Sequence, residues 1–170
     1  MRVLIDTNIL LRSSQPNHPV SSLSVQAVSK LLRENGAVFF CPQNIAEFWN
    51  VATRPIEMNG LGLSPREAIL EIEGVESAMS LLPDVPAIYP AWKHIIRDYN
   101  VQGTRLVATM AVYAVESILT FNVADFKRYG MVNHPAGSGP RFVADAITLC
   151  EMLGVGRRDW CRGCRRPETG

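Results

Sequence analysis

The stretch Met1-Arg-Val-Leu-Ile-Asp-Thr-Asn8 decides the fold. Residues 3–5 form a short apolar run without polar alternation, which is typical of a strand buried on both faces of a parallel sheet. The run stops at Asp6, and Thr7 and Asn8 keep the next turn polar. A polar cluster directly after a buried strand indicates that the chain leaves the core there, and it marks a candidate functional site.

Other short apolar runs alternate with helical patterns along the chain. The pattern predicts further strands over residues 37–41 and 117–121, and an edge strand over 80–82. It predicts helices over 22–35 and 90–99, one behind Asn44 as an N-cap, one after the Ser64-Pro65-Arg66-Glu67 start, and one from Thr104 to Val115. Strands that alternate with helices indicate an α/β protein. We expect a three-layer α/β/α sandwich with a central parallel sheet.

The length of 170 residues predicts one domain with a C-terminal extension. Residues 1–132 hold the alternating pattern, and 133–170 form a divergent segment with one helix expected over 142–153 and a disordered Arg-rich tail. A hydrophobic fraction of 47% and a charged fraction of 19% are those of a folded protein. No run is long and apolar enough to span a membrane, and the N-terminus lacks the features of a signal peptide. We therefore expect a cytoplasmic protein.

The near-neutral total charge hides an uneven distribution. Seventeen Lys and Arg against 16 Asp and Glu give +1, which excludes a histone-like polycation. Residues 157–166 (RRDWCRGCRR) carry five Arg and one Asp, a local +4, so the other 160 residues sum to −3. These Arg residues suit either contacts to RNA phosphates or a solvated tail. Cys161 and Cys164 have the CxxC spacing of a zinc site, but further ligands at a common spacing are missing.

Acidic and amide side chains follow three of the predicted strands. Asp6 and Asn8 follow the first, Glu47 begins the helix after the second, and Asn122 and Asp125 follow the strand over 117–121. In a parallel sheet these groups meet at one carboxyl edge, where ligands bind. Carboxylates gathered there repel one another by about 1–4 kcal/mol for each close pair unless a cation neutralises them. Oxygen ligands favour Mg²⁺ or Mn²⁺.

Each acid also has a structural interpretation. Asp6 could cap the turn that follows it, Glu47 could close a capping box with Asn44, and Asp125 could end a helix. The metal-site hypothesis depends on the joint placement of the three at one edge.

Three segments resemble one known family. The opening Met1-Arg-Val-Leu-Ile-Asp-Thr-Asn-Ile-Leu10, the Gln43-Asn-Ile-Ala-Glu-Phe48 segment and Leu119-Thr-Phe-Asn-Val-Ala-Asp-Phe126 resemble PIN domains, and among them the VapC-type ribonucleases of toxin–antitoxin pairs. The resemblance covers about residues 1–130. It implies a ribonuclease that cleaves single-stranded RNA with Mg²⁺ or Mn²⁺, a cognate antitoxin and a homodimer. By this resemblance Asp6, Glu47 and Asp125 match acids of the family quartet, and Asn122 matches a polar position beside the last.

The sequence departs from the family at the third acid. The family carries a His-Asp-Ala-Arg-like segment where this chain reads Val101-Gln-Gly-Thr-Arg105. Aligned without a gap, Gly103 occupies the acid position; alternatively, about five residues of the active-site loop are deleted. Both alignments remove the carboxylate. Replacing a residue that supports a metal ligand typically lowers metal affinity or activity by about 10–100-fold. Loss of a ligand itself should lower them at least as much.

Three functions compete for this sequence. The first is a metal-dependent endoribonuclease in which Asp6, Glu47 and Asp125 hold the cation, Asn8 and Asn122 orient water or phosphate, and water attacks. The second is a catalytically impaired PIN-like module that binds RNA or an antitoxin without cleaving. The third is an aspartyl-nucleophile phosphatase of the haloacid-dehalogenase type, which expects a second Asp at the position of Asn8 and therefore ranks last.

Overall fold

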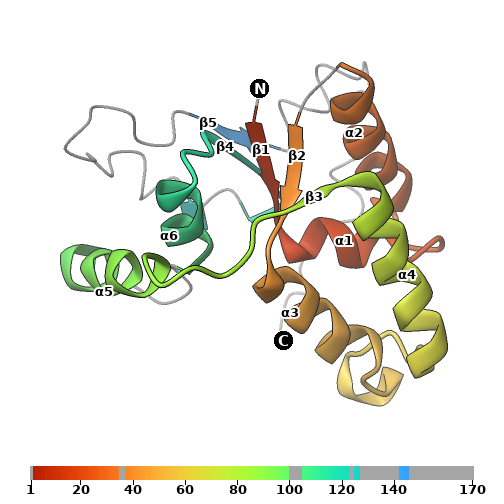
Figure 1. Ribbon diagram of the computed structural model, residues 1–170. Helices are drawn as coiled ribbons and strands as arrows, with labels where there is room; N and C mark the ends of the chain where they lie inside the picture. The colour runs from red at the N-terminus through yellow and green to blue at the C-terminus, as the bar shows by residue number, and fades with distance from the viewer. Residues whose placement is uncertain (1, 35–36, 100–104, 123–124, 127–141, 146–170) are drawn as a thin grey trace, which may run out of the picture.

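The computed structural model describes residues 2–34, 37–99, 105–122, 125–126 and 142–145. Their elements in chain order are β1 (Arg2–Ile5), α1 (Thr7–Ser13), α2 (Ser21–Arg33), β2 (Ala37–Phe40), α3 (Pro42–Ala52), η1 (Ile56–Met58), α4 (Pro65–Ala78), β3 (Ser80–Leu81), α5 (Ile88–Tyr99), α6 (Arg105–Val112), β4 (Ser117–Thr120) and β5 (Phe142–Asp145). The described strands pair in parallel in the order β3-β2-β1-β4-β5 (Figure 1). Within these ranges, no helix has both the length and the apolar character that crossing a membrane requires.

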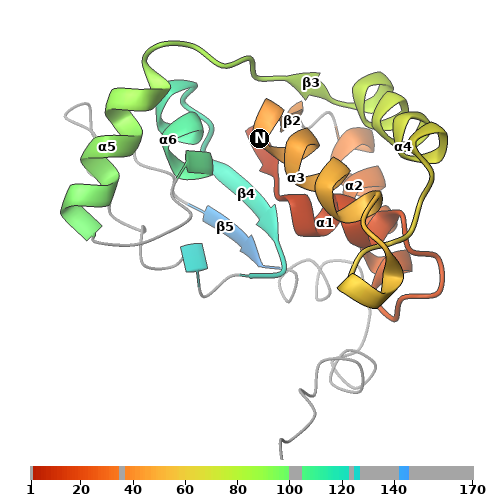
Figure 2. The same ribbon diagram turned by 90° about the horizontal axis from the view of Figure 1, so that it is seen from below.

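Helices cover both faces of the sheet. Val3 and Ile5 of β1 pack on one face in a buried cluster that also contains residues of α1, α2, α3 and α4. Leu4, which points to the opposite face, packs with Leu106 and Met110 of α6, and α5 lies against α6. Figures 1 and 2 show α1–α4 on one side of the sheet and α5 and α6 on the other. The predicted α/β/α sandwich around a parallel sheet is therefore confirmed.

Two helix starts show how the local sequence sets the elements. Ser64 caps α4 as predicted, because its Oγ accepts from the Glu67 backbone N–H and its own N–H donates to Glu67 Oε2 at 2.8 Å. The prediction that Asn44 caps α3 is wrong. The helix begins earlier, at Pro42, after an extended Cys41. Asn44 lies inside the first turn and reaches back, so that its Oδ1 accepts from the Cys41 N–H at 2.9 Å.

Two further segments differ from the prediction. Residues 7–13, to which the sequence pattern assigns no element, form helix α1, because Ile9 and Leu10 bury an apolar face behind the polar Thr7 and Asn8. The helix expected over 142–153 is wrong for residues 142–145, which form β5 and pair in parallel with β4. A short apolar run such as Phe142-Val-Ala144 satisfies both patterns, and periodicity alone does not separate them. The expected tail and its CxxC spacing lie outside the described residues.

Candidate active site at the carboxyl edge of the sheet

The strand order reverses beside β1. From β1 the chain moves outward through β2 to β3, then returns to place β4 on the other side of β1 and continues to β5. Neighbouring strand ends from which the chain departs in opposite directions leave a crevice at the carboxyl edge, and α/β proteins bind ligands there. Asp6 follows β1 and Asn122 follows β4, so both lie at the edge where the strand order reverses.

Asp6 lies at the centre of a hydrogen-bonded cluster. Its Oδ2 accepts from Thr120 Oγ1 at 2.6 Å and from Asn8 Nδ2 at 2.7 Å. Asn8 Nδ2 also reaches Thr120 Oγ1 at 3.1 Å, and Asn8 Oδ1 accepts from the Phe121 N–H at 3.3 Å. Thr120 at the end of β4 and Asn8 in the first turn of α1 thus hold the carboxylate in one orientation.

Burial sets the electrostatics of Asp6. The residue is 8% exposed, and this desolvation raises the pKa of its carboxyl group above the ordinary value. The hydrogen bond from Thr120 opposes the shift, and the negative charge of Glu47 adds to it. None of the groups that shift this pKa is a cation. A buried carboxylate with an acidic neighbour and only neutral donors is a favourable place for a cation to bind.

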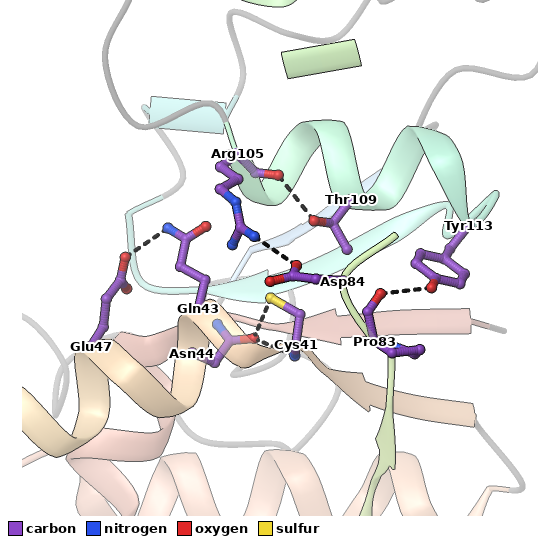
Figure 3. Close-up of polar contacts among 9 residues, drawn as sticks. All are labelled: Cys41, Gln43, Asn44, Glu47, Pro83, Asp84, Arg105, Thr109 and Tyr113. Atoms are coloured by element: carbon purple, nitrogen blue, oxygen red, sulfur yellow. Dashed lines mark hydrogen bonds and ion pairs between the residues drawn. The ribbon is translucent and has the colours of Figure 1, made fainter. Parts of the chain in front are cut away.

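Glu47 reaches the same edge from α3. Its Oε2 accepts from Thr7 Oγ1 at 2.6 Å, and Thr7 Oγ1 accepts from Asn44 Nδ2 at 3.2 Å. Its Oε1 accepts from Gln43 Nε2 at 2.7 Å (Figure 3). Thr7 directly follows Asp6 in sequence, so this contact fixes α3 to the end of β1. The capping box that would have made Glu47 purely structural does not form, because Asn44 turns back to Cys41 instead.

Gln43 leaves one polar atom without a partner. Its Oε1 is buried and accepts no hydrogen bond from any described residue. Buried acceptors are normally satisfied, so an orphaned one calls for a donor or a cation. Gln43 Nε2 donates to Glu47, which places this free oxygen on a side chain that adjoins the acidic group.

Hydrogen bonds donated by their backbone N–H groups tie Asn122 and Asp125 to the end of β4. The Asn122 N–H donates to Thr120 Oγ1 at 2.9 Å, and the Asp125 N–H donates to the Asn122 carbonyl at 3.0 Å. Both residues are exposed. In the part of the chain that the structure describes, no three His, Cys, Asp or Glu side chains form a group that could hold a metal ion. The structure therefore joins Asp6 and Asn8 by a hydrogen bond, links Glu47 to the same strand end through Thr7, and connects Asn122 and Asp125 by main-chain contacts.

The start of α6 carries an ion pair. Arg105 Nη2 lies 2.6 Å from Asp84 Oδ1, in the segment after β3 (Figure 3). Arg105 and Asp84 act in opposite directions on the nearby Cys41 thiol, whose pKa is raised chiefly by burial. Gly103, the position where the family acid is missing, lies outside the described residues, as does Thr104.

Sequence reasoning misses two residues of this site. The apolar pattern places Thr120 in a strand and Gln43 before a helix, and it assigns neither a role. A threonine that ends an apolar strand is the available signal for the first; for Gln43, its spacing of four residues from Glu47 is the signal. No known protein-family model matches this chain, and no curated protein matches it.

Proposed function

We propose that the chain is a metal-dependent endoribonuclease that cleaves single-stranded RNA and acts as the toxin of a toxin–antitoxin pair. The observation that carries this proposal is the buried Asp6 carboxylate, with the acidic Glu47 as its neighbour, at the sheet edge where the strand order reverses. The resemblance of residues 1–130 to PIN domains supplies the reaction and the partners. By that resemblance the protein would be a homodimer that binds a cognate antitoxin, and we place it in the cytoplasm, as expected from the sequence.

The residues present fit a hard cation. Asp6 and Glu47 offer carboxylate oxygens, which are the ligand type of Mg²⁺ and Mn²⁺. The Gln43 amide turns its nitrogen toward Glu47, so its unpartnered oxygen faces away from that carboxylate (Figure 3). Asp6 and Glu47 would hold the ion, and Asp125 joins them by the resemblance alone, since the structure does not group its carboxylate with theirs. When bound, the ion would supply positive charge for the scissile phosphate and lower the pKa of a water molecule.

The protein's own groups would position the substrate and the water. Thr120 and Asn8 hold the Asp6 carboxylate in one orientation, so this carboxylate would be oriented before RNA binds. The exposed Asn122 amide would orient a phosphate oxygen or a water, whereas the Asn8 amide already donates to Asp6 and Thr120 and would act by holding the Asp6 carboxylate. Water is the attacking group, so the site needs no nucleophilic side chain.

A second candidate is a PIN-like module that binds RNA or an antitoxin without cleaving. The observation that favours it is Gly103, which stands where the family carries its third acid. Loss of that ligand would lower activity by at least about 10–100-fold. The two candidates share the same crevice and differ only in turnover.

Cleavage of a panel of single-stranded RNA oligonucleotides in Mg²⁺ or Mn²⁺ tests both candidates. We expect cleavage by the wild-type chain and a loss of at least about 10–100-fold in Asp6→Ala. Glu116→Ala, which removes an exposed acid before β4, is the matched control and should cleave as the wild type does. Equal cleavage by wild type and Asp6→Ala would exclude the nuclease. A wild-type chain that is inactive until Gly103→Asp is introduced would favour the impaired module.

A further inference from the structure

An open apolar groove of about 690 Å³ lies between α3, α4 and the edge of the sheet at β3, and none of the proposed metal ligands lines it. Ile45 and Trp49 of α3 line one wall, and Ile69 of α4 and Leu81 of β3 line the other. Ile69 is 45% exposed and Leu81 is 50% exposed. Contiguous exposed apolar side chains with a polar rim mark binding surfaces. β3 is also an edge strand, and edges of sheets are usually covered or charged.

The rim of this groove is acidic. Helix α4 carries Glu67, Glu71, Glu73 and Glu76 against the single Arg66. Ile69, Glu73 and Glu76 share one face of the helix at spacings of four and three residues, and Glu76 lines the groove itself. Glu73 and Glu76 are exposed and form no ion pair with the described residues. The groove therefore suits an occupant with a large apolar side chain and several positive charges.

We propose that the Arg-rich C-terminal segment of this chain, residues 157–166, docks in the groove between α3 and α4. The segment places Trp160 among five Arg, so a single aromatic anchor is flanked by cations. A Trp side chain buries about 150–250 Å², which suits the exposed apolar walls. The Arg residues complement Glu73 and Glu76. Docking would also bring the local +4 of the segment close to acidic groups of the other 160 residues, which sum to −3.

The length of the chain permits this contact within one molecule. β5 and β3 are the two edge strands of the described sheet, and four strand spacings of about 4.8 Å put them roughly 19 Å apart. Residues 146–156 connect the end of β5 to the segment, and an extended chain of that length spans up to roughly 40 Å. The described strands are all parallel, so β5 and β3 end at the same edge of the sheet.

Disulfide trapping in the full-length chain tests the proposal, because the segment already carries Cys161 and Cys164. Asn50 lines the groove and is exposed, so Asn50→Cys offers a thiol there. Glu116→Cys, in the exposed segment before β4, is the control. Cysteines link only when their Cα atoms come within about 7 Å. Both variants also carry Cys164→Ser, so that Cys161 cannot pair within its own CxxC. Under mild diamide oxidation, which takes up the two electrons and two protons released, we expect an intramolecular link from the thiol introduced by Asn50→Cys to Cys161, formed at least about tenfold faster than any link from the control.

Charge reversal separates docking from chance collision. Adding Glu73→Lys and Glu76→Lys to Asn50→Cys should slow the link by about tenfold, since each exposed pair contributes a factor of roughly two to five. Adding Arg165→Glu and Arg166→Glu should then restore the rate. Circular dichroism checks that each variant is folded. Equal link rates for Asn50→Cys and Glu116→Cys, or insensitivity to both reversals, would overturn the proposal. Links between two molecules would assign the groove to a second copy and would likewise contradict it.

Discussion

At the residue scale, Asp6 is a buried carboxylate, and none of the groups that shift its pKa is a cation that would compensate for the loss of water. Burial raises the pKa of its carboxyl group and Glu47 raises it further, while the donors that lower it are neutral. A carboxylate in this setting weakens the fold when it is ionised. Sites that hold such groups commonly do so for function, because binding and catalysis require groups that stability alone would replace.

Asp6→Asn should stabilise the metal-free protein at neutral pH. The native pKa of Asp6 lies above its unfolded value, so the native state binds more protons in that window, and wild-type stability falls as pH rises through it. Asparagine keeps an oxygen for the bonds from Thr120 and Asn8 but carries no charge. Thermal unfolding in EDTA should show the gain at pH 7, at roughly 2–4 °C for each kcal/mol. The gain should vanish below the ordinary Asp pKa of 3.8. A gain of the same size at both pH values would contradict the electrostatic origin.

Thr120→Val should destabilise the protein by about 1–3 kcal/mol, because it leaves buried polar groups unpaired. Thr120 is fully buried, and its Oγ1 serves Asp6, Asn8 and the Asn122 N–H. Since the hydrogen bond from Thr120 lowers the Asp6 pKa, its removal should cost more at pH 7 than at pH 3. Urea unfolding at both pH values measures the loss. Thr120→Ser is the control and should recover most of it; a serine variant as weak as the valine would show that the methyl group matters instead.

At the scale of elements, patterning predicted the strands and most of the helices, and it failed where a short segment has two interpretations. The apolar runs of β1, β2 and β4 were unambiguous because both faces of a central parallel strand are buried. The run over residues 142–145 was ambiguous, because an apolar run of that length also fits one face of a helix. The start of α3 was misplaced because Asn44 is a good N-cap by type, although its amide works from inside the first turn.

The candidate site was predictable to the same degree. Asp6, Asn8 and Glu47 come together because parallel strands end at one edge, which the order of elements implies. The roles of Thr7, Thr120 and Gln43 could not be predicted, because they depend on rotamers and on distances of about 3 Å between side chains from different elements.

Helix α4 contains a position that evolution has not optimised for stability. A Cβ added at Gly74 would meet nothing within 4 Å, and Gly lowers helix stability by roughly 0.5–1 kcal/mol relative to Ala. Gly74→Ala should therefore raise the free energy of urea unfolding by that amount. Gly60→Ala is the contrasting variant: its Cβ would lie 1.9 Å from the Arg54 carbonyl oxygen, so the backbone after η1 must shift and stability must fall. A destabilised Gly74→Ala would mean that something covers this face of α4.

At the scale of the whole molecule, the sheet order links the candidate site to global stability. Asp6 directly follows the central strand β1, and its N–H donates to the Leu119 carbonyl of β4 at 2.9 Å. Unfolding of the sheet therefore separates Asp6 from Thr120 and from α3. A cation held by Asp6, Glu47 and Asp125 would bind the native state and not the unfolded chain, so it should stabilise the entire fold by mass action.

The melting temperature should consequently rise with Mn²⁺ or Mg²⁺ in the wild type and stay unchanged in Asp6→Asn. At a concentration of one hundred times Kd the gain is about 2.7 kcal/mol, or roughly 5–10 °C for a chain of this size. Glu116→Gln should keep the full rise, and NaCl at matched ionic strength should give none. The two stability curves are then expected to cross, with Asp6→Asn above the wild type in EDTA and below it in saturating cation. An equal rise in both proteins would locate the bound cation elsewhere and remove Asp6 from the site. The crossing itself would be evidence that the destabilising carboxylate is retained for the ion, and it requires no knowledge of the RNA substrate.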